Sequence, residues 1–276
     1  MTKLQKEDLF GLYPISCTEA YVMAYLYKVG YDITTFYYSS FISINHIVSD
    51  FLKCKNSFSL YEGMERVQDV AKALNVLNYC GKITEKFRNI EFSCDMVLIE
   101  VTKEYYNKIY NRNLWREDHF VYVYPLNDSN FFYLNNNPLH EANFCVDLLE
   151  EMYNKHYIKF WVDENSKFIE LEDILNKLKD RVNNEMNFST VNNLVDVDFS
   201  LARDIINYIR ISWLRINSLL KKYGHFEKKY IDDINRVFTQ IEYSRIRNRY
   251  NSKIFCEGIE MLKKDQDEIV RYLLDL

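Results

Sequence analysis

Glycine and proline are scarce in this chain of 276 residues, which has 6 Gly and 3 Pro, and no proline follows Pro138. Little therefore interrupts a helical pattern in the second half. No stretch of about 18 apolar residues occurs, which excludes a membrane-spanning helix, and the start, MTKLQKEDLF, lacks the apolar core of a signal peptide. A net charge of −5 gives no basic excess for nucleic acid. We expect a cytoplasmic protein that binds neither membrane nor nucleic acid.

Closely spaced cysteines are also missing. The six cysteines form no C-x-x-C motif, which argues against a disulfide framework and a zinc knuckle. His140 with Cys145, and His156 with Asp163, lack the spacing and the fourth partner of a metal site, so no metal is expected. The cysteines are Cys17, Cys54, Cys80, Cys94, Cys145 and Cys256.

One of these cysteines lies where its reactivity is favoured, in the stretch GLYPISCTEAYVMAYLY. Ser16 is a suitable N-cap, and Glu19 completes the S-x-x-E pattern of a capping box, so Cys17 is predicted at the first helical position. There the unpaired N–H groups and the helix dipole favour the thiolate. Glu19 acts in the opposite sense, so an imidazolium nearby has to complete the stabilisation. Gly30 is predicted to end this helix.

Strands are predicted after Gly81. Residues 94–102 are rich in β-forming residues, residues 119–126 alternate, and residues 131–136 follow a polar turn, so the last two segments are expected to form a hairpin. Residues 103–118 are predicted to form a loop or short helix that borders a cleft.

A thiol nucleophile needs a histidine and a group that orients it. His119 opens the first of the two strands that form the hairpin. Asn136, or alternatively Asn135, closes the next strand, where its side chain can hold the imidazole. The structural alternative is a packed thiol at Cys17 and an ordinary strand-edge histidine at His119.

The remaining segments are predicted from their periodicity. Residues 60–79 repeat apolar positions at helical spacing, and residues 139–167 are interpreted as a bridge. His46, in the unassigned stretch 31–59, is interpreted as structural. Four amphipathic helices with a common core are predicted at 171–186, 199–224, 228–250 and 253–276.

The expected fold class is α+β. We place one domain at residues 1–165 and a helical domain at residues 166–276.

Residues 11–138 resemble the papain-like cysteine peptidases, and within them the N-terminal domain of the butirosin biosynthesis protein H family. Four segments carry the resemblance, in the order ISCTEAYVMAYL, VLIEVTKEYYNKIY, DHFVYVYPLND and FFYLNNNP. The resemblance implies a papain-like fold, made of a helix and an antiparallel sheet and followed by a helical bundle. It implies a catalytic triad of Cys17, His119 and Asn136 or Asn135. The family normally has Asp at the third position, where this chain has three asparagines ending at Asn137.

The resemblance also implies an activity, that of an amide-forming acyltransferase in antibiotic biosynthesis, similar to the protease-like enzyme of closthioamide biosynthesis. An acyl group would pass from an acyl carrier protein thioester to Cys17 and then to an amine. The enzyme would need no cofactor of its own, because phosphopantetheine arrives on the carrier protein. Two alternatives stay open: a cysteine peptidase or isopeptidase that hydrolyses an amide, and a non-catalytic binding protein on the same fold.

Two basic groups of residues are candidates for contacts with partners. Lys108, Arg112 and Arg116 precede His119 and could receive an acidic carrier protein, although an ordinary solvated face explains them equally well. The helical motif R-I-R-N-R at residues 245–249 is interpreted as a solvent face rather than a nucleic-acid contact, because the protein is acidic.

Overall fold

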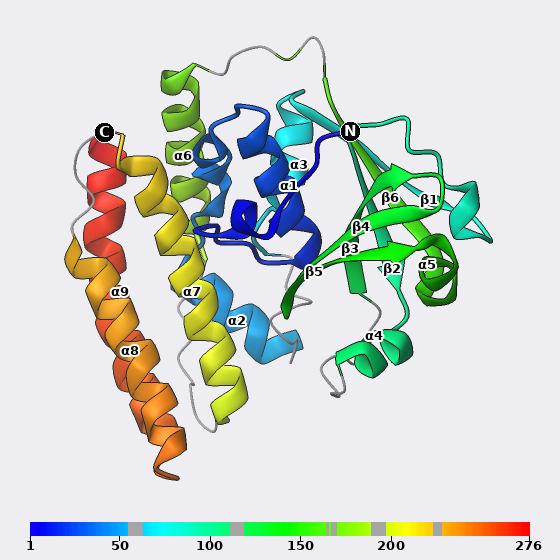
Figure 1. Ribbon diagram of the computed structural model, residues 1–276. Helices are drawn as coiled ribbons and strands as arrows, with labels where there is room; N and C mark the ends of the chain where they lie inside the picture. The colour runs from blue at the N-terminus through cyan, green and yellow to red at the C-terminus, as the bar shows by residue number, and fades with distance from the viewer. Residues whose placement is uncertain (55–62, 111–118, 164–165, 167–169, 189–196, 223–227) are drawn as a thin grey trace. The chain divides into compact units, whose positions relative to one another are not determined.

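The computed structural model describes residues 1–54, 63–110, 119–163, 166, 170–188, 197–222 and 228–276. The chain divides into two compact units (Figure 1). Unit 1 comprises Met1–Ile33 and Arg66–Phe168, and unit 2 comprises Thr34–Glu65 and Ile169–Leu276. This division differs from the two continuous domains predicted at residues 1–165 and 166–276, because residues 34–65 leave unit 1 and join the C-terminal helices.

Unit 1 is built on an antiparallel sheet, which six strands form within the described residues. Their spatial order is β1-β6-β2-β3-β4-β5, so β6 lies between two strands that come much earlier in the chain. With the helices described below, this sheet confirms the α+β class. The strands are β1 (Leu77–Ile83), β2 (Met96–Val101), β3 (His119–Asn127), β4 (Asn130–Asn136), β5 (Leu139–Cys145) and β6 (Tyr153–Val162).

The predicted hairpin is confirmed, since β3 pairs with β4 and Tyr122 lies opposite Leu134. Its turn is held by the side chain of Asn127, whose Oδ1 accepts hydrogen bonds from the N–H groups of Ser129 and Asn130 at 3.0 and 2.9 Å. A short polar side chain that satisfies its own turn in this way is a common reason for asparagine at such a position.

The helix α1 (Cys17–Lys28) packs against β3 and β4 (Figure 1). It ends as predicted at Gly30, whose positive φ of 96° suits a residue without Cβ. The N–H of Gly30 donates to Tyr27 O and the N–H of Tyr31 donates to Leu26 O, which together form a Schellman motif. This motif gives two of the last carbonyls of α1 a hydrogen-bond partner.

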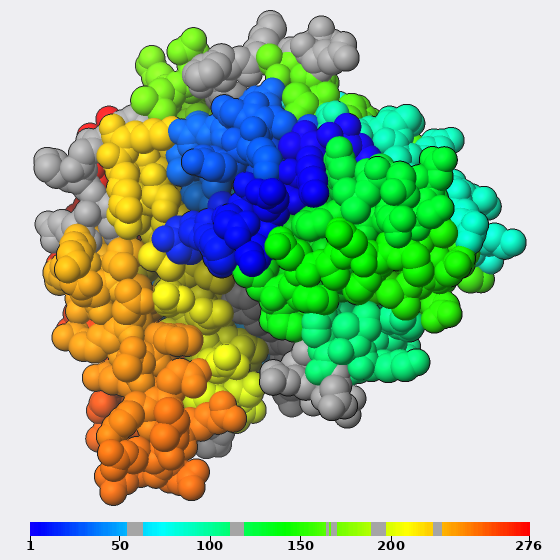
Figure 2. Space-filling model, viewed as in Figure 1, coloured from blue at the N-terminus to red at the C-terminus, as the bar shows by residue number. Residues whose placement is uncertain are grey.

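The segment before α1, which includes the 3-10 helix η1 (Lys6–Leu9), lies over β4 and β5, as Figure 2 shows for the N-terminal residues. The N–H of Leu4 donates to the hydroxyl of Tyr122 at 3.2 Å, and that hydroxyl donates to Thr2 O at 2.8 Å. The ammonium of Lys3 lies 4.7 Å from the centre of the Phe132 ring.

The opposite face of the sheet is covered by η4 (Phe87–Asn89), α4 (Lys103–Tyr110) and α5 (Val146–Met152). Alternate residues of β2 and β3 point into this core, which is the period-2 pattern expected of strands. Its buried residues are Phe87, Ile90, Val97, Ile99, Val101, Tyr106, Val121, Val123, Phe131, Tyr133, Val146, Leu149, Met152, Tyr153 and Tyr157.

The helix predicted at residues 60–79 is wrong in its extent. Helix α3 covers only Val67–Ala73, and Leu77 already begins β1. The helix ends because Asn75 adopts a positive φ of 56°, and the N–H of Val76 then donates back to Ala71 O at 2.8 Å. Asparagine tolerates this left-handed conformation better than most residues, so it acts here as glycine commonly does. Strands were predicted only after Gly81, but this residue already lies inside β1.

Residues 139–167, predicted as a bridge, contain β5, α5 and β6, so that prediction is also wrong. In β5 half-buried residues alternate with exposed ones, and in β6 charged residues interrupt the apolar positions. Their apolar pattern is therefore too weak to mark a strand from the sequence.

Unit 2 is helical in the part of the chain that is described. The four predicted C-terminal helices are confirmed as α6 (Leu171–Glu185), α7 (Phe199–Leu220), α8 (Lys228–Ile246) and α9 (Ser252–Asp275). A helix that the sequence did not reveal, α2 (Ile44–Cys54), packs with α7 and α9. Gly224, the last residue of the helix predicted at 199–224, lies outside the described residues.

His46, which was interpreted as structural, joins α2 to α6. Its Nδ1 lies 2.9 Å from Glu185 Oε2, and its Nε2 lies 3.1 Å from Asp50 Oδ2. Its ring stacks on that of Phe188 with the centroids 3.7 Å apart.

Candidate active site

Cys17 is the first residue of α1, as the sequence predicts. The hydroxyl of Ser16, the N-cap, accepts a hydrogen bond from the N–H of Glu19 at 3.1 Å. The first N–H groups of an α-helix have no acceptor within the helix, and they give this end a partial positive charge. The half-buried thiol of Cys17 therefore lies where a negative charge is stabilised.

The carboxylate of Glu19 reaches beyond the capping box that its position predicts. Its Oε2 accepts from the N–H of Ile15 at 2.6 Å, and its Oε1 accepts from the N–H of Val67 at 2.7 Å. The side chain is fully buried. Glu19 therefore holds the loop before Cys17 and the first residue of α3 together.

His119, the first residue of β3, lies beside Cys17. Burial of the thiol is the largest single influence on the pKa of Cys17 and raises it. The hydrogen bond to His119 and the charge of its imidazolium oppose burial, with smaller help from the N–H of Phe120 and the side chain of Thr18. Together these groups outweigh burial and lower the pKa of Cys17 below its ordinary value.

The imidazole of His119 is held from its other side by Asn135, with Nε2 and Oδ1 3.0 Å apart. Asn135 is fully buried and His119 is 3% exposed, so water does not compete for this contact. Oδ1 can only accept, so Nε2 carries a proton and donates it. The neutral ring then has an unprotonated Nδ1, and that atom can take the proton of the Cys17 thiol.

The amide of Asn135 is fixed in turn by three acceptors around its Nδ2. They are the hydroxyl of Tyr106 at 2.7 Å, the backbone O of Pro138 at 2.8 Å and the hydroxyl of Tyr110 at 3.2 Å. Because the carbonyl of Pro138 accepts only, the amide nitrogen has to point towards it, and this places Oδ1 towards His119.

The tyrosines extend this network. The hydroxyl of Tyr106 donates to the backbone O of Asn137, and its ring lies 5.0 Å from that of His119. The hydroxyl of Tyr110 lies 3.0 Å from Nδ1 of His140. Sequence reasoning did not select Tyr106 or Tyr110. Their spacing of four residues in a short helix puts both on one face, and this signal could have identified them.

The favoured orienting residue, Asn136, does not contact His119. Its N–H donates to the hydroxyl of Tyr21 at 2.9 Å, and its Oδ1 lies 3.4 Å from the same hydroxyl. The reason is the alternation of side chains along β4. Leu134 and Asn136 point to the face that α1 covers, whereas Asn135 points to the face that His119 shares. The structure thus brings Cys17 and His119 together with the alternative residue, Asn135.

The remaining predicted partners are only partly described. Lys108 is exposed on α4, and its ammonium lies 5.8 Å from the centre of the Tyr105 ring. Arg112 and Arg116 lie outside the described residues, so the predicted basic patch stays a prediction.

The weak metal candidates are engaged elsewhere. His140 contacts Tyr110, and Nδ1 of His156 lies 2.6 Å from Glu100 Oε2. Within the described ranges, no three residues of the types His, Cys, Asp and Glu are grouped so that they could hold a metal ion.

Comparison of the sequence with protein-family models and with curated proteins found no match. Among the helices that the structure describes, none combines the length and the apolar character needed to cross a membrane.

Proposed function

We propose that this protein is a cysteine-dependent acyltransferase with a papain-like fold that forms an amide bond. The observation that carries the proposal is the linked array of Cys17, His119 and Asn135, in which the thiol has a lowered pKa and the imidazole has a defined proton position. Such an array activates a thiol for covalent catalysis. The order of the three residues in the chain is that of papain-like enzymes, which adds support.

In the first step His119 takes the proton of Cys17, and the thiolate attacks the carbonyl carbon of a carrier-protein thioester. The carbon–sulfur bond to phosphopantetheine breaks, and the leaving thiolate receives the proton from His119. The acyl group is then a thioester on Cys17. The exchange of one thioester for another is nearly neutral in free energy, so this step needs no ATP.

In the second step an amine attacks the acyl group on Cys17. His119 removes a proton from the amine, the carbon–sulfur bond to Cys17 breaks, and the amide leaves. The cysteine thiolate ends with the imidazolium beside it, ready for another turnover. Water has to be excluded during this step, because hydrolysis of the acyl-enzyme is also downhill.

The negative oxygen formed in each step needs donors. The N–H groups of Cys17 and Thr18 are the first two of α1, and we assign them this role. The helix dipole adds to their effect. We further propose that the protein acts in the cytoplasm in the biosynthesis of a nonribosomal natural product and receives its acyl group from an acyl carrier protein.

Intact-protein mass spectrometry after mixing with an acyl carrier protein thioester tests the proposal. An acyl adduct is expected on the wild type and on Cys145→Ala, a control that removes an exposed thiol, but not on Cys17→Ala. With an amine present, the product is expected to be the amide.

Two other outcomes lead to different functions. Release of the free acid despite the amine identifies a hydrolase of the peptidase type. Absence of any adduct with thioester or peptide substrates overturns both enzymatic functions and leaves a binding protein.

A further inference from the structure

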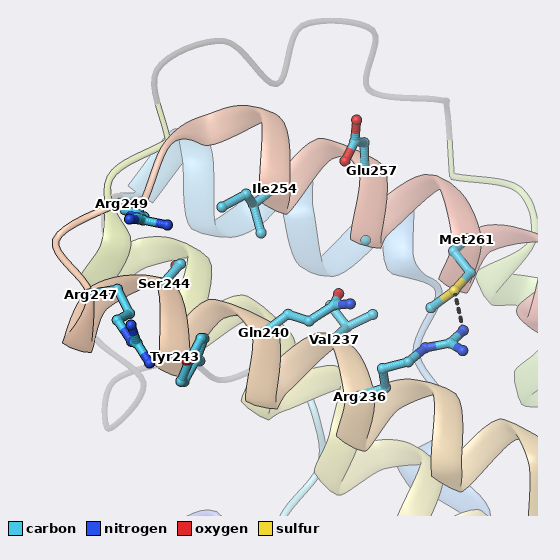
Figure 3. A pocket seen from close by; sticks show the side chains of 11 residues that line it. Arg236, Val237, Gln240, Tyr243, Ser244, Arg247, Arg249, Ile254, Glu257 and Met261 are labelled. Carbon is cyan, nitrogen blue, oxygen red and sulfur yellow. Dashed lines mark hydrogen bonds between the residues drawn. The ribbon is translucent and has the colours of Figure 1, made fainter.

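A groove of about 610 Å³ lies between α8 and α9 in unit 2 (Figure 3). Its volume is within the range of roughly 300–1,000 Å³ that small-molecule sites have. The residues that line it are Arg236, Val237, Gln240, Tyr243, Ser244, Arg247, Arg249, Ile254, Glu257, Gly258 and Met261. None of these residues takes part in the array around Cys17.

Two small buried residues, Ser244 and Gly258, lie at the base of the groove. Gly258 permits close approach of the two helices, because a Cβ there would lie 2.6 Å from Cγ1 of Val237. The groove is therefore a consequence of how α8 and α9 pack, and it does not depend on a long loop.

The uncompensated charge of the groove lies at one end, where Figure 3 shows both Arg247 and Arg249. Within the described residues, neither guanidinium has a carboxylate within 4.0 Å, and Arg247 instead lies 5.0 Å from the centre of the Tyr243 ring. Both arginines belong to the basic motif at residues 245–249 that the proposed function leaves unused. Two exposed guanidinium groups without counter-ions attract an anion.

The other charged residues of the groove are already compensated. Arg236, at the opposite end, lies 2.9 Å from Asp233, and Glu257 lies 3.7 Å from Lys253. In Figure 3 the carboxylate of Glu257 points away from the space between the helices. The positive charge of Arg247 and Arg249 is therefore not neutralised by the other charged residues of the groove.

Apolar side chains line the part of the groove beyond the arginines, namely Val237, Ile254 and Met261. The hydroxyl of Tyr243 and the amide of Gln240, both exposed residues, add polar groups that can bind a ligand. Arginine binds phosphate through two parallel N–H donors, and an apolar wall suits the body of the molecule that bears the phosphate.

We propose that the groove between α8 and α9 binds a small phosphate ester, with its phosphate between Arg247 and Arg249 and its apolar body along Ile254 and Met261. This inference is independent of the proposed function, because it rests on residues of unit 2 alone. An extended nucleic acid is disfavoured, because the net charge of the protein is −5.

Phenyl phosphate is a suitable probe, with inorganic phosphate, phenol and a single-stranded oligonucleotide for comparison. Methyl NMR of the full chain follows binding directly, because Val237, Ile254 and Met261 all carry methyl groups in the groove. Phenyl phosphate is expected to shift these signals saturably and to bind more tightly than phosphate or phenol.

The variant Arg247→Gln/Arg249→Gln is expected to weaken this binding about tenfold or more, because it removes charge-assisted hydrogen bonds. The control Lys264→Gln/Arg271→Gln removes the same charge from exposed residues of α9 outside the groove and is expected to change the affinity less than about twofold. Absence of saturable shifts, equal binding of phenol, or equal loss in the control overturns the proposal. Binding of the oligonucleotide without phenyl phosphate also overturns it, in favour of a nucleic-acid contact.

Discussion

The imidazole of His119 and the amide of Asn135 lie on neighbouring antiparallel strands, with 3.0 Å between Nε2 and Oδ1. An amide differs from a carboxylate in this position, because it is neutral and has a donor as well as an acceptor. The donor side of Asn135 is fixed by Tyr106, Tyr110 and Pro138. The orientation of His119 therefore depends on a network of neutral groups.

The first prediction separates the two asparagines that could hold His119. Asn135→Ala is expected to slow alkylation of Cys17 by iodoacetamide at pH 7 roughly tenfold or more, because the imidazole loses its fixed position. Asn136 contacts Tyr21 instead of His119, so Asn136→Ala is expected to change the alkylation rate less than about twofold. The rate is measured on the peptide that contains Cys17, by mass spectrometry. Equal losses in both variants, at equal folded fractions, would contradict the assignment of Asn135.

The second prediction concerns the pH dependence of the same reaction. The thiolate reacts, and the lowered pKa of Cys17 means that alkylation of the wild type reaches half its maximum below pH 9.0, the ordinary value. His119→Ala removes the two largest influences that lower this pKa and leaves burial, which raises it, opposed only by the smaller effects of Phe120 and Thr18, so the profile should move to higher pH. Each unit by which the pKa of Cys17 rises reduces the thiolate fraction at neutral pH about tenfold. A profile unchanged by His119→Ala would show that the imidazole does not stabilise the thiolate.

The third prediction tests the support of Asn135. Tyr106→Phe removes the closest hydroxyl acceptor of its Nδ2 and leaves a buried donor without that partner. We expect unit 1 to lose about 1–2 kcal/mol of stability and alkylation of Cys17 to slow. Tyr105→Phe, in the same helix, is the matched control and should change neither quantity appreciably. Urea unfolding, followed by the near-ultraviolet signal, measures the first effect, and full retention of stability in Tyr106→Phe would contradict the proposed support.

The fourth prediction concerns Glu19, whose two carboxylate oxygens accept from Ile15 and Val67. Glu19→Gln replaces one acceptor by an amide donor, which then faces a backbone N–H. We expect a loss of about 1–3 kcal/mol in the free energy of unfolding. Glu85→Gln, which alters an exposed ion pair with Lys155, is the control and should cost less than about 1 kcal/mol. Equal stability of the two variants would show that Glu19 does not hold α3 to the loop.

The sequence was informative wherever one local pattern decided the structure. Ser16 and Gly30 fix the ends of α1, the polar turn fixes the hairpin of β3 and β4, and the C-terminal helices follow from long periodic segments. It was less informative for β6, which is stabilised by β1 and β2 on either side and has little pattern of its own.

Within the candidate site, the sequence indicated Cys17 and His119 but favoured Asn136 over Asn135. The last apolar residue of a strand does not show which face the following side chain uses. The pairing of Leu134 with Tyr122 decides that face, and a pairing register cannot be read from one strand alone. The role of Glu19 was missed for a similar reason, because Val67 is distant in the chain.

The place of β6 in the sheet also matters while the chain is being synthesised. Cys17, His119 and Asn135 have all left the ribosome before Tyr153 begins the strand that joins β1 to β2. Until then the sheet lacks an inner strand, and its two parts expose unpaired edges that favour aggregation. A truncated chain that ends before Tyr153 would thus contain every residue of the candidate site, but we expect it to hold them less firmly, because β2 loses its pairing with β6. We therefore expect the candidate site to assemble only after synthesis has passed well beyond its last residue.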